Sequence, residues 1–531
     1  MKDIFKIILI LIVCRKLALC NGAGKSYYTA GVVEFLPTIA GMSSADIVNE
    51  HLEAYVRIIK SAEANDTDII VFPEGTLNNA LQTTYVPAAH EKVVPCLNVT
   101  GMVYADFLMQ LSCAARTARK YLVINLTEKE NCTAVAQDTR SCAANGLNVY
   151  NTNVVFDREG CVISRYRKVH IYVEQKNTTL EPEYGIFETD FGVRFGHFIC
   201  FDILFYTPAE ELVVRYGIKD IIFTSMFYSE LPFLTAVQLQ QSWAWGNDVN
   251  VLAAGASLPV AGVTGTGIYA GVQGDLVSVM VGGVGIRKLY VSQVPIISNK
   301  TLTNDYEYKQ KTETSMPIVA SDELTLLKDP QIENFTSLLL DFTTQQNITQ
   351  TLCNNDFCCR FDIATQSIDT PAETVYYKYR IGAFKGQRTY QKNEWSDIQI
   401  CALYACKNES VASCAEIFNS TAVVKPNIAF KSLQIVGDFM KADKLLIMPN
   451  TLDGSLLSLS AETLGWHVID QREHYTAHMN LTRPYCDSLL TFGIYANYYD
   501  RSATTRTASY SNTTPTVLLC TLALVLLVWR F

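Results

Sequence analysis

Three side chains that could do chemistry stand at or just past the ends of three predicted strands: Glu74, Lys168 and Cys200. Ligands of open α/β sheets bind at the carboxyl ends of the strands, so this shared placement is meaningful. A thiol with a pKa of about 8.5 is only a few per cent ionised at neutral pH, and it needs a base or a nearby cation to act as a nucleophile. A carboxylate and an ammonium group would supply these. Each residue alone is ordinary, because such a glutamate or lysine is usually a solvated surface charge.

The cysteine count leaves Cys200 without a partner. Three of the sixteen cysteines, Cys14, Cys20 and Cys520, lie in apolar terminal segments that we expect to be removed. The remaining number is odd, which implies at least one free thiol in an oxidising compartment. Setting Cys200 aside leaves enough cysteines for six disulfides, and Cys200 is the one embedded in a predicted strand. The alternative is a buried thiol that packs as a small hydrophobic side chain.

Two histidines lie close to these residues in the sequence. His197 precedes Cys200 by three positions, and because side chains alternate along a strand, this odd offset sends it to the opposite face. We therefore expect His197 to be packed or capped. His170 shares its parity with Lys168 and stays open as a partner of the site.

Metal ions and nucleic acids are not expected as partners. The spacings Cys353-x4-Cys358 and Cys401-x4-Cys406 lack the partner spacing of a closed zinc site, and in a secreted chain disulfides are the default. The net charge of −9 and the lack of a Lys/Arg run argue against a surface that binds polyanions. The 531 residues, with 49% hydrophobic, suffice for one large core and a second domain.

Both ends of the chain carry targeting patterns. Residues 1–20 resemble a secretory signal peptide, with two lysines ahead of the apolar stretch Ile7–Val13. The apolar stretch Val517–Trp529 spans only about 20 Å at about 1.5 Å per helical residue, short of the hydrocarbon core of about 30 Å. With the small polar residues before it, segment 501–531 resembles a GPI-anchor signal, and a short membrane span is the alternative. We expect an extracellular protein anchored at the cell surface.

Asn-x-Ser/Thr sequons occur at a density that suits a glycosylated extracellular protein. Besides one at Asn512 in the predicted anchor signal, the candidates are Asn65, Asn98, Asn125, Asn131, Asn177, Asn299, Asn334, Asn347, Asn408, Asn419 and Asn480.

The pattern of apolar residues predicts an α/β domain over residues 21–300 and a smaller β-rich domain over 334–500, joined by a linker over 301–333. In the first domain, short apolar runs alternate with stretches of helical periodicity. In the second, apolar and polar residues alternate and cysteines cluster, so we expect strands stapled by disulfides. The expected elements of the first domain are helices over Ser44–Ala64, Val103–Arg119 and Pro232–Gly246, and strands over Asp68–Phe72, Tyr121–Asn125, Asn148–Phe156, Cys161–Lys168, Val193–Cys200, Asp220–Thr224 and Val249–Ala254.

Two local signals concern the connections between these elements. The four residues from Asp157 to Gly160 have the composition of a hairpin turn. Thr207-Pro-Ala-Glu210 has the form of a capping box with proline at the first helical position, and Gly217 supplies a stop. They predict a well-defined helix directly after Cys200.

At these residues the sequence resembles the vanin and biotinidase group of the nitrilase superfamily, over most of residues 25–300. The motifs that carry the resemblance are Ile69-Ile-Val-Phe-Pro-Glu74, Val149-Tyr-Asn-Thr-Asn-Val-Val-Phe-Asp157, Ser164-Arg-Tyr-Arg-Lys168, Phe198-Ile-Cys-Phe-Asp-Ile-Leu-Phe-Tyr-Thr-Pro-Ala209, Trp243-Ala-Trp-Gly246, Val249-Asn-Val-Leu-Ala253 and Thr264-Gly-Thr-Gly-Ile-Tyr-Ala270. The β-rich tail domain and the anchor signal also fit this group, and the anchor favours the vanins.

The resemblance implies an αββα sandwich in which Glu74 is the general base, Lys168 the electrostatic stabiliser and Cys200 the nucleophile. Its chemistry is hydrolysis of a linear, non-peptide amide of a small molecule through a thioester, without metal or organic cofactor. Pantetheine would give pantothenate and cysteamine; alternatively, biocytin would give biotin and lysine. The chain departs from the usual pattern at Gly75, where an acidic residue is common, and at Gly255 and Ser257, where Asn and His are expected. These departures favour a further alternative, a glycosylated surface protein that binds without turnover.

Overall fold

The computed structural model describes residues 26–97, 103–132, 140, 142–297, 320–391 and 394–504. The expected signal peptide, nearly all of the expected anchor signal, and the sequons at Asn98, Asn299 and Asn512 lie outside these residues. Within the described part of the chain, no helix is both long and apolar enough to cross a membrane.

The first half of the chain builds one connected sheet system of twelve strands, with order β5-β4-β3-β2-β1-β10-β8-β7-β6 and with β11, β12 and β13 joined at β10 and β1. The strands are β1 (Tyr27–Phe35), β2 (Ile69–Val71), β3 (Tyr121–Asn131), β4 (Leu147–Phe156), β5 (Val162–Arg167), β6 (Gly185–Glu188), β7 (Arg194–Ile199), β8 (Asp220–Ser225), β10 (Asn250–Ala256), β11 (Thr266–Ala270), β12 (Asp275–Val279) and β13 (Arg287–Pro295). The helices are α2 (Ser44–Ile59), α3 (Asp106–Ala118), α4 (Glu211–Val214) and α5 (Ala236–Asn247).

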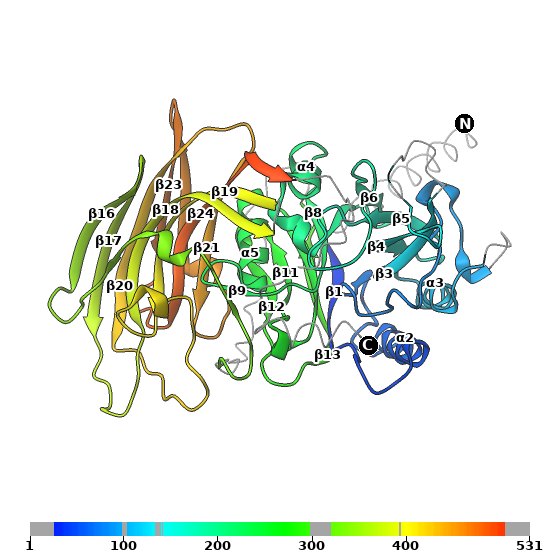
Figure 1. Cartoon of the computed structure of the whole chain (residues 1–531), viewed down its shortest axis with the longest axis horizontal. Helices are drawn as coiled ribbons and strands as arrows, with labels where there is room; N and C mark the ends of the chain where they lie inside the picture. The colour runs from blue at the N-terminus through cyan, green and yellow to red at the C-terminus, as the bar shows by residue number, and fades with distance from the viewer. Residues whose placement is uncertain are drawn as a thin grey trace, which may run out of the picture.

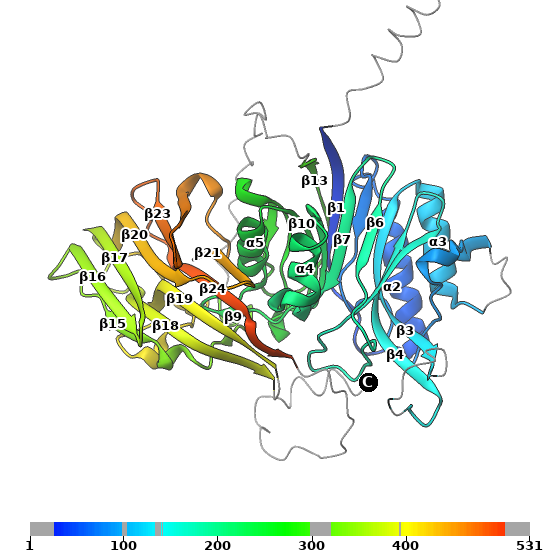
Figure 2. The ribbon, with the colours of Figure 1, turned by 90° about the horizontal axis from the view of Figure 1, so that it is seen from above.

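Alternate residues of these strands face different layers, as the period of a strand requires. In β2, Ile69 and Val71 pack into a core of strand and loop residues, whereas Ile70 packs with side chains of α2 and α3. On the other half of the sheet system, Phe223 and Val251 pack with α5. Helices therefore cover both outer faces of two strand layers (Figures 1 and 2). The predicted αββα sandwich is confirmed.

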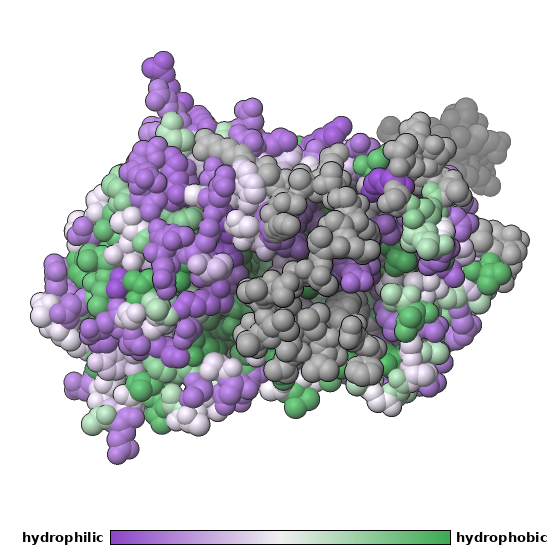
Figure 3. Space-filling view, in the orientation of Figure 1, coloured by the Kyte–Doolittle hydropathy of each residue, from purple (hydrophilic) through white to green (hydrophobic). Residues whose placement is uncertain are grey.

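The second half of the chain forms two five-stranded sheets, which we call the C-terminal sheets. One has the order β15-β18-β19-β24-β21 and the other β16-β17-β20-β23-β22. Their strands are β15 (Thr336–Leu339), β16 (Asn347–Asn354), β17 (Phe357–Ser367), β18 (Lys378–Gln391), β19 (Glu394–Cys406), β20 (Ile428–Met440), β21 (Leu445–Asp453), β22 (Leu464–Asp470), β23 (His474–Leu481) and β24 (Leu489–Thr504). On the face seen in Figure 3, hydrophilic residues cover much of these strands.

The two halves are packed tightly against each other. Helix α5 lies between its own sheet and β21, and a Cβ atom at Gly246 would lie only 2.9 Å from Leu446 Cδ1. Glycine at this position therefore permits the close approach. Residues 320–333, which the sequence assigns to a linker, are also packed: Leu324 is fully buried, and β14 (Leu327–Lys328) pairs in parallel with β9 (Glu230–Leu231).

The disulfide pattern corrects the expectation of six bridges. Five bridges form: Cys96–Cys113, Cys132–Cys142, Cys353–Cys358, Cys359–Cys401 and Cys406–Cys414. Among the described residues, Cys161 and Cys486 are free thiols, as Cys200 is. They belong to different sheet systems, because Cys161 follows the turn between β4 and β5, whereas Cys486 bridges to Phe430 in the C-terminal sheets. The clustered cysteines do staple the β-rich half, and Cys359–Cys401 joins its two sheets.

The segment after Cys200 also differs from the prediction. Instead of one capped helix there are a short 3-10 helix η4 (Cys200–Leu204), a π-helical turn η5 (Tyr206–Glu210) and the four-residue α4. Thr207 is extended (φ −101°, ψ 123°), which is the conformation that its expected N-cap position requires. The Glu210 carboxylate accepts from Asn247 Nδ2 at 3.0 Å. The expected stop at Gly217 (φ +66°) is confirmed.

Candidate active site

Glu74 lies in the turn after β2 and is 5% exposed. Its Oε1 accepts hydrogen bonds from Lys168 Nζ and Asn151 Nδ2, both at 2.7 Å, and its Oε2 accepts one from the backbone N–H of Met226 at 2.7 Å. The next residue, Gly75, has φ +66°, a conformation that favours glycine. The carboxylate is therefore fixed by three donors.

Lys168 follows β5, is 2% exposed, and lies between two carboxylates. Its Nζ is 2.7 Å from Glu74 Oε1 and 2.8 Å from Glu174 Oε1. Burial alone would lower the pKa of Lys168, but the charges of Glu174 and Glu74 outweigh it and hold this pKa well above its usual value. The ammonium group thus stays charged in a site that excludes water.

Glu174 is the site residue that the sequence reasoning missed. It lies in the loop after Lys168, where strand parity gives no information, and the preceding Val173 has φ +53°, which is unusual for a β-branched residue. Burial would raise the pKa of Glu174, but Lys168 and Lys176 lower it to about 2. Asn151 Nδ2 also lies 3.0 Å from Glu174 Oε2, so one amide bridges both carboxylates.

Cys200 is the first residue of η4, directly after β7, and has φ +50°. A non-glycine residue in this region costs about 1–3 kcal/mol, and such strain is found at functional sites. The thiol is 5% exposed, is not in a disulfide, and lies close enough to the Glu74 carboxylate for that charge to act on it. Burial and the charge of Glu74 raise the pKa of Cys200 against the opposing effect of Lys168. The resting thiol therefore keeps its proton and has its acceptor in place.

Buried asparagine amides hold the side chain of Asn151, which donates to the carboxylates of Glu74 and Glu174. Asn125 Nδ2 donates to Asn151 Oδ1 at 2.8 Å and to Asn153 Oδ1 at 3.1 Å, while Asn125 Oδ1 accepts from Gly75 N at 2.9 Å. Thr224 Oγ1 donates to Asn153 Oδ1 at 2.9 Å. These contacts fix which way the Asn151 amide points, and hence the donor that it presents to Glu74.

The same contacts rule out one predicted glycosylation site. Asn125 is fully buried and its side chain is used in the network, so it has no room for a glycan in the folded protein. Asn177 and Asn480 are half-buried, and Asn177 Oδ1 accepts from Val149 N at 2.8 Å. The exposed candidates in the described residues are Asn65, Asn131, Asn334, Asn347, Asn408 and Asn419.

The two histidines have separate places. His197 is fully buried, its Nε2 lies 2.7 Å from Ser164 Oγ, and burial lowers its pKa to about 3. The prediction that it is packed away from the thiol is confirmed. His170 lies beside Thr207 and Glu394, with hydrogen bonds from its two ring nitrogens to those residues.

Two of the three departures from the family pattern lie around a different buried acid. Gly255 has no room for a side chain, because a Cβ atom would lie 2.4 Å from Gly265 O. Ser257 is fully buried near the Glu34 carboxyl, whose pKa burial raises to about 7, and its Oγ accepts from Ile286 N at 3.1 Å. Only Gly75 adjoins the Glu74 site, where a Cβ atom would lie 3.2 Å from Met226 Cε. The departures at Gly255 and Ser257 are thus explained by packing.

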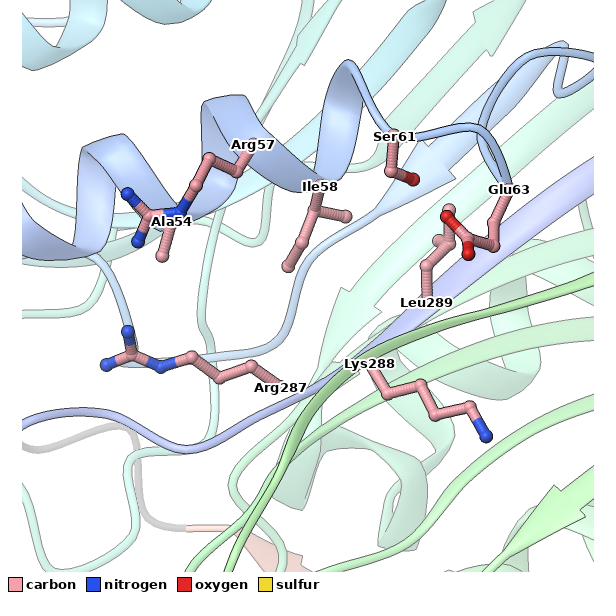
Figure 4. Close-up of a pocket in the computed structure, with 8 residues that line it drawn as sticks. All are labelled: Ala54, Arg57, Ile58, Ser61, Glu63, Arg287, Lys288 and Leu289. Atoms are coloured by element: carbon pink, nitrogen blue, oxygen red, sulfur yellow. The ribbon is translucent and has the colours of Figure 1, made fainter.

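A separate surface pocket of about 340 Å³ lies at the end of α2 beside β13 (Figure 4). Its charged lining includes Arg57, Arg287 and Lys288. The Arg287 guanidinium is already bound to Glu50 and Thr38 at 3.0 and 3.1 Å. None of the candidate catalytic residues lines this pocket, so it is separate from the Cys200 site.

Comparison with known proteins agrees with both halves of the fold. Residues 38–281 match the carbon-nitrogen hydrolase family, and residues 324–502 match the vanin C-terminal domain. Vanin-like protein 1 of Drosophila melanogaster is 46% identical over 491 residues, covering 91% of this chain and 88% of that protein. The chain belongs to the vanin and biotinidase group of the carbon-nitrogen hydrolases. As a member of this group, it is an amide-hydrolysing enzyme.

Other members of the group are more distant. Pantetheinase of Sus scrofa is 31% identical over 405 residues, covering 74% of each chain, and biotinidase of Homo sapiens is 27% identical over 517 residues, covering 90% of each chain. Among solved structures, Nit3 of Saccharomyces cerevisiae, a member of branch 10 of the nitrilase superfamily, aligns with 51% of this chain and 91% of its own at a TM-score of 0.38 and 17% identity. The five disulfides, together with the vanin and biotinidase relatives, support an extracellular protein.

Proposed function

We propose that this vanin-like enzyme hydrolyses pantetheine to pantothenate and cysteamine, with Cys200 as nucleophile, Glu74 as general base and Lys168 as electrostatic stabiliser. One observation carries the proposal: the unpaired thiol of Cys200, on a residue with positive φ, lies under the charge of a carboxylate that is itself held by a buried lysine. This is the arrangement that nucleophilic catalysis by a thiol of raised pKa requires.

The reaction has two halves. Cys200 Sγ attacks the amide carbonyl carbon while Glu74 takes the thiol proton, and the carbonyl oxygen becomes an oxyanion. Lys168 Nζ and the backbone N–H of Phe201 are the donors for that oxyanion, a contribution of about 3 kcal/mol each. Glu74 then gives the proton to the leaving amine, and the C–N bond breaks to leave a thioester on Cys200.

Hydrolysis of the thioester reverses these roles. Glu74, again a carboxylate, removes a proton from water as its oxygen attacks the thioester carbon. The C–S bond breaks, the sulfur recovers a proton from Glu74, and the acid is released. One carboxylate thus serves as base, acid, base and acid in turn, which suits a side chain fixed by three donors.

The choice of substrate is supported by two relatives that are named pantetheinase, at 31% and 28% identity. The relatives named biotinidase, at 27% and 30% identity, favour biocytin as the second candidate. Both substrates are linear amides of a small carboxylic acid, so the same site chemistry serves either one.

A substrate screen separates these candidates. The purified protein and its Cys200→Ala variant would be incubated with pantetheine and with biocytin, and mass spectrometry would follow the released acid and amine. We expect cysteamine and pantothenate from the wild type and neither from the variant. Release of lysine and biotin alone would transfer the assignment to biocytin, and full turnover by the variant would eliminate Cys200 as the nucleophile.

The proposal includes secretion, glycosylation and a GPI anchor attached between residues 502 and 512. Strand β24 ends at Thr504, inside the small polar stretch that precedes the apolar tail. The test is treatment of expressing cells with a phosphatidylinositol-specific phospholipase. Release of the protein into the medium is expected, and retention after treatment would favour the short membrane span.

A further inference from the structure

The C-terminal sheets donate hydrogen bonds to the C-terminal end of η4, the helix that begins with Cys200. The last carbonyl groups of a helix have no partner within it and need one from elsewhere. Leu204 O, at the end of η4, accepts from Ser396 Oγ of β19 at 3.5 Å and from Asn497 Nδ2 of β24 at 3.3 Å. Figure 2 shows the ends of β19 and β24 reaching toward the first half of the molecule.

His170 makes the second connection between these parts. Its Nε2 is 2.8 Å from Thr207 O, which follows η4, and its Nδ1 is 3.3 Å from Glu394 Oε1, at the start of β19. The ring also stacks on Phe205, with centroids 3.9 Å apart and planes 13° apart. A single buried imidazole thus touches the nucleophile segment on two sides and the C-terminal sheets on a third.

The partners of His170 restrict which hydrogen bonds the ring can form. A backbone carbonyl and a carboxylate can only accept, and a neutral imidazole has only one N–H to donate. Both contacts are hydrogen bonds only when the ring is an imidazolium. The carboxylate of Asp202 accepts the His170 backbone N–H at 2.8 Å and adds a second negative charge. The nearby cation, Lys168, is already held by its own carboxylates.

Glu394 is itself held in place. Its Oε2 accepts from Gln391 Nε2 at 2.9 Å, and the same amide donates to Ile171 O at 2.7 Å. The side chain of Glu394 is 15% exposed, and that of His170 is 6% exposed. Little water therefore competes for this ion pair.

We propose that His170 and Glu394 form a charged latch through which the C-terminal sheets hold the Cys200 segment in its attacking position. Both are positioning residues, and the proposal rests on the proposed role of Cys200. Few residues separate the latch from the thiol. Phe205, on which His170 stacks, packs edge-on against Phe201 with centroids 5.0 Å apart, and Phe201 directly follows Cys200 in the chain. Tyr390 of β18 packs on Phe201 at 5.6 Å, so the C-terminal sheets also support this ring.

The latch predicts a pH dependence that a purely structural contact would not produce. Without the second ring proton, Nδ1 is an acceptor that faces a carboxylate, so the contact breaks and kcat falls. In Glu394→Gln, the introduced amide can donate to that same unprotonated Nδ1. The alkaline decline of kcat should therefore be weaker in Glu394→Gln than in the wild type.

The experiment measures kcat and KM from about pH 6 to about pH 9 for the wild type and three variants. Glu394→Ala should lower kcat by about tenfold or more with little change in KM, because small displacements of a reacting group are costly. Glu394→Gln should keep more than about a third of kcat at neutral pH and lose the alkaline decline. The matched control is Asp438→Asn, which removes a carboxylate 3.7 Å from His474 on the outer C-terminal sheet and should leave kcat and its pH profile unchanged.

The outcomes separate the latch from the proposed reaction. If Cys200→Ala is inactive but Glu394→Ala and Glu394→Gln both keep the wild-type kcat and pH profile, the latch is wrong and the reaction stands. If Cys200→Ala keeps full turnover, the reaction itself is wrong. Should Glu394→Ala fail to fold, the isosteric Glu394→Gln variant still decides through its pH profile. The rate of Cys200 alkylation by iodoacetamide gives a readout without substrate, and we expect it to change in Glu394→Ala.

Discussion

Replacing Glu174 by glutamine tests the charge arrangement around Lys168. Burial opposes ionisation of Glu174, but the ammonium groups of Lys168 and Lys176 lower its pKa from 4.5 to about 2. Such a shift corresponds to about 3 kcal/mol of folding free energy at neutral pH. Because folding lowers this pKa, the contribution is fully present above about pH 4.5 and is lost as the pH falls toward about 2. About 2 kcal/mol of it should disappear between about pH 6 and about pH 3.

The assay is urea unfolding of both proteins across this pH range, followed by tryptophan fluorescence. Trp243 is almost fully buried in α5 and reports on the hydrolase half. Lowering the pH reduces the unfolding free energy of both proteins. We expect this reduction to be about 2 kcal/mol smaller in Glu174→Gln than in the wild type. The control is Glu53→Gln, because the Glu53 side chain is 73% exposed and pairs only with an exposed arginine. A variant that loses stability as steeply as the wild type would refute the charge arrangement.

Three further predictions follow from the same contacts. Asn151→Ala should lower kcat by about tenfold to a hundredfold, since it removes the donor shared by two carboxylates, and steady-state kinetics on pantetheine would show it. Glycopeptide mass spectrometry should find Asn125 unmodified, and a glycan at that site would contradict its burial. Thiol titration of the denatured, unreduced mature protein should count three free thiols, Cys161, Cys200 and Cys486; a count of one would restore the expected sixth bridge.

The sequence predicts those features that depend on neighbours along the chain. Alternating apolar residues placed the strands, and the turn from Asp157 to Gly160 closes as expected, with Gly160 at φ +76° and its N–H bonded to Asp157 O. Because strand ends are set locally, the positions of Glu74, Lys168 and Cys200 at one edge were also readable. The structure brings Glu74 and Lys168 into contact and places Cys200 where the charges of both act on its thiol.

The missed features depend on residues that are distant in sequence or on loop conformation. Glu174 reaches Lys168 only because the loop turns at Val173, whose positive φ no local pattern predicts. The sequon at Asn125 is locally intact but is buried by contacts from Gly75 and Asn151. The capping box assigns the Glu210 carboxylate to the backbone N–H of Thr207, but this carboxylate binds the distant Asn247 instead.

Glu174 also explains how one lysine can serve two stages of the proposed reaction. The two carboxylates of Glu74 and Glu174 are balanced by the ammonium groups of Lys168 and Lys176, the latter 3.1 Å from Glu174 Oε2, while the Cys200 thiol is neutral. When Glu74 accepts the thiol proton, the negative charge passes to the oxyanion, while Lys168 stays paired with Glu174 at 2.8 Å. Lys168 is then free of its contact with Glu74 and can face the oxyanion. In Glu174→Gln the carboxylate that holds Lys168 in place is lost, so the loss of activity should fall on kcat rather than on KM.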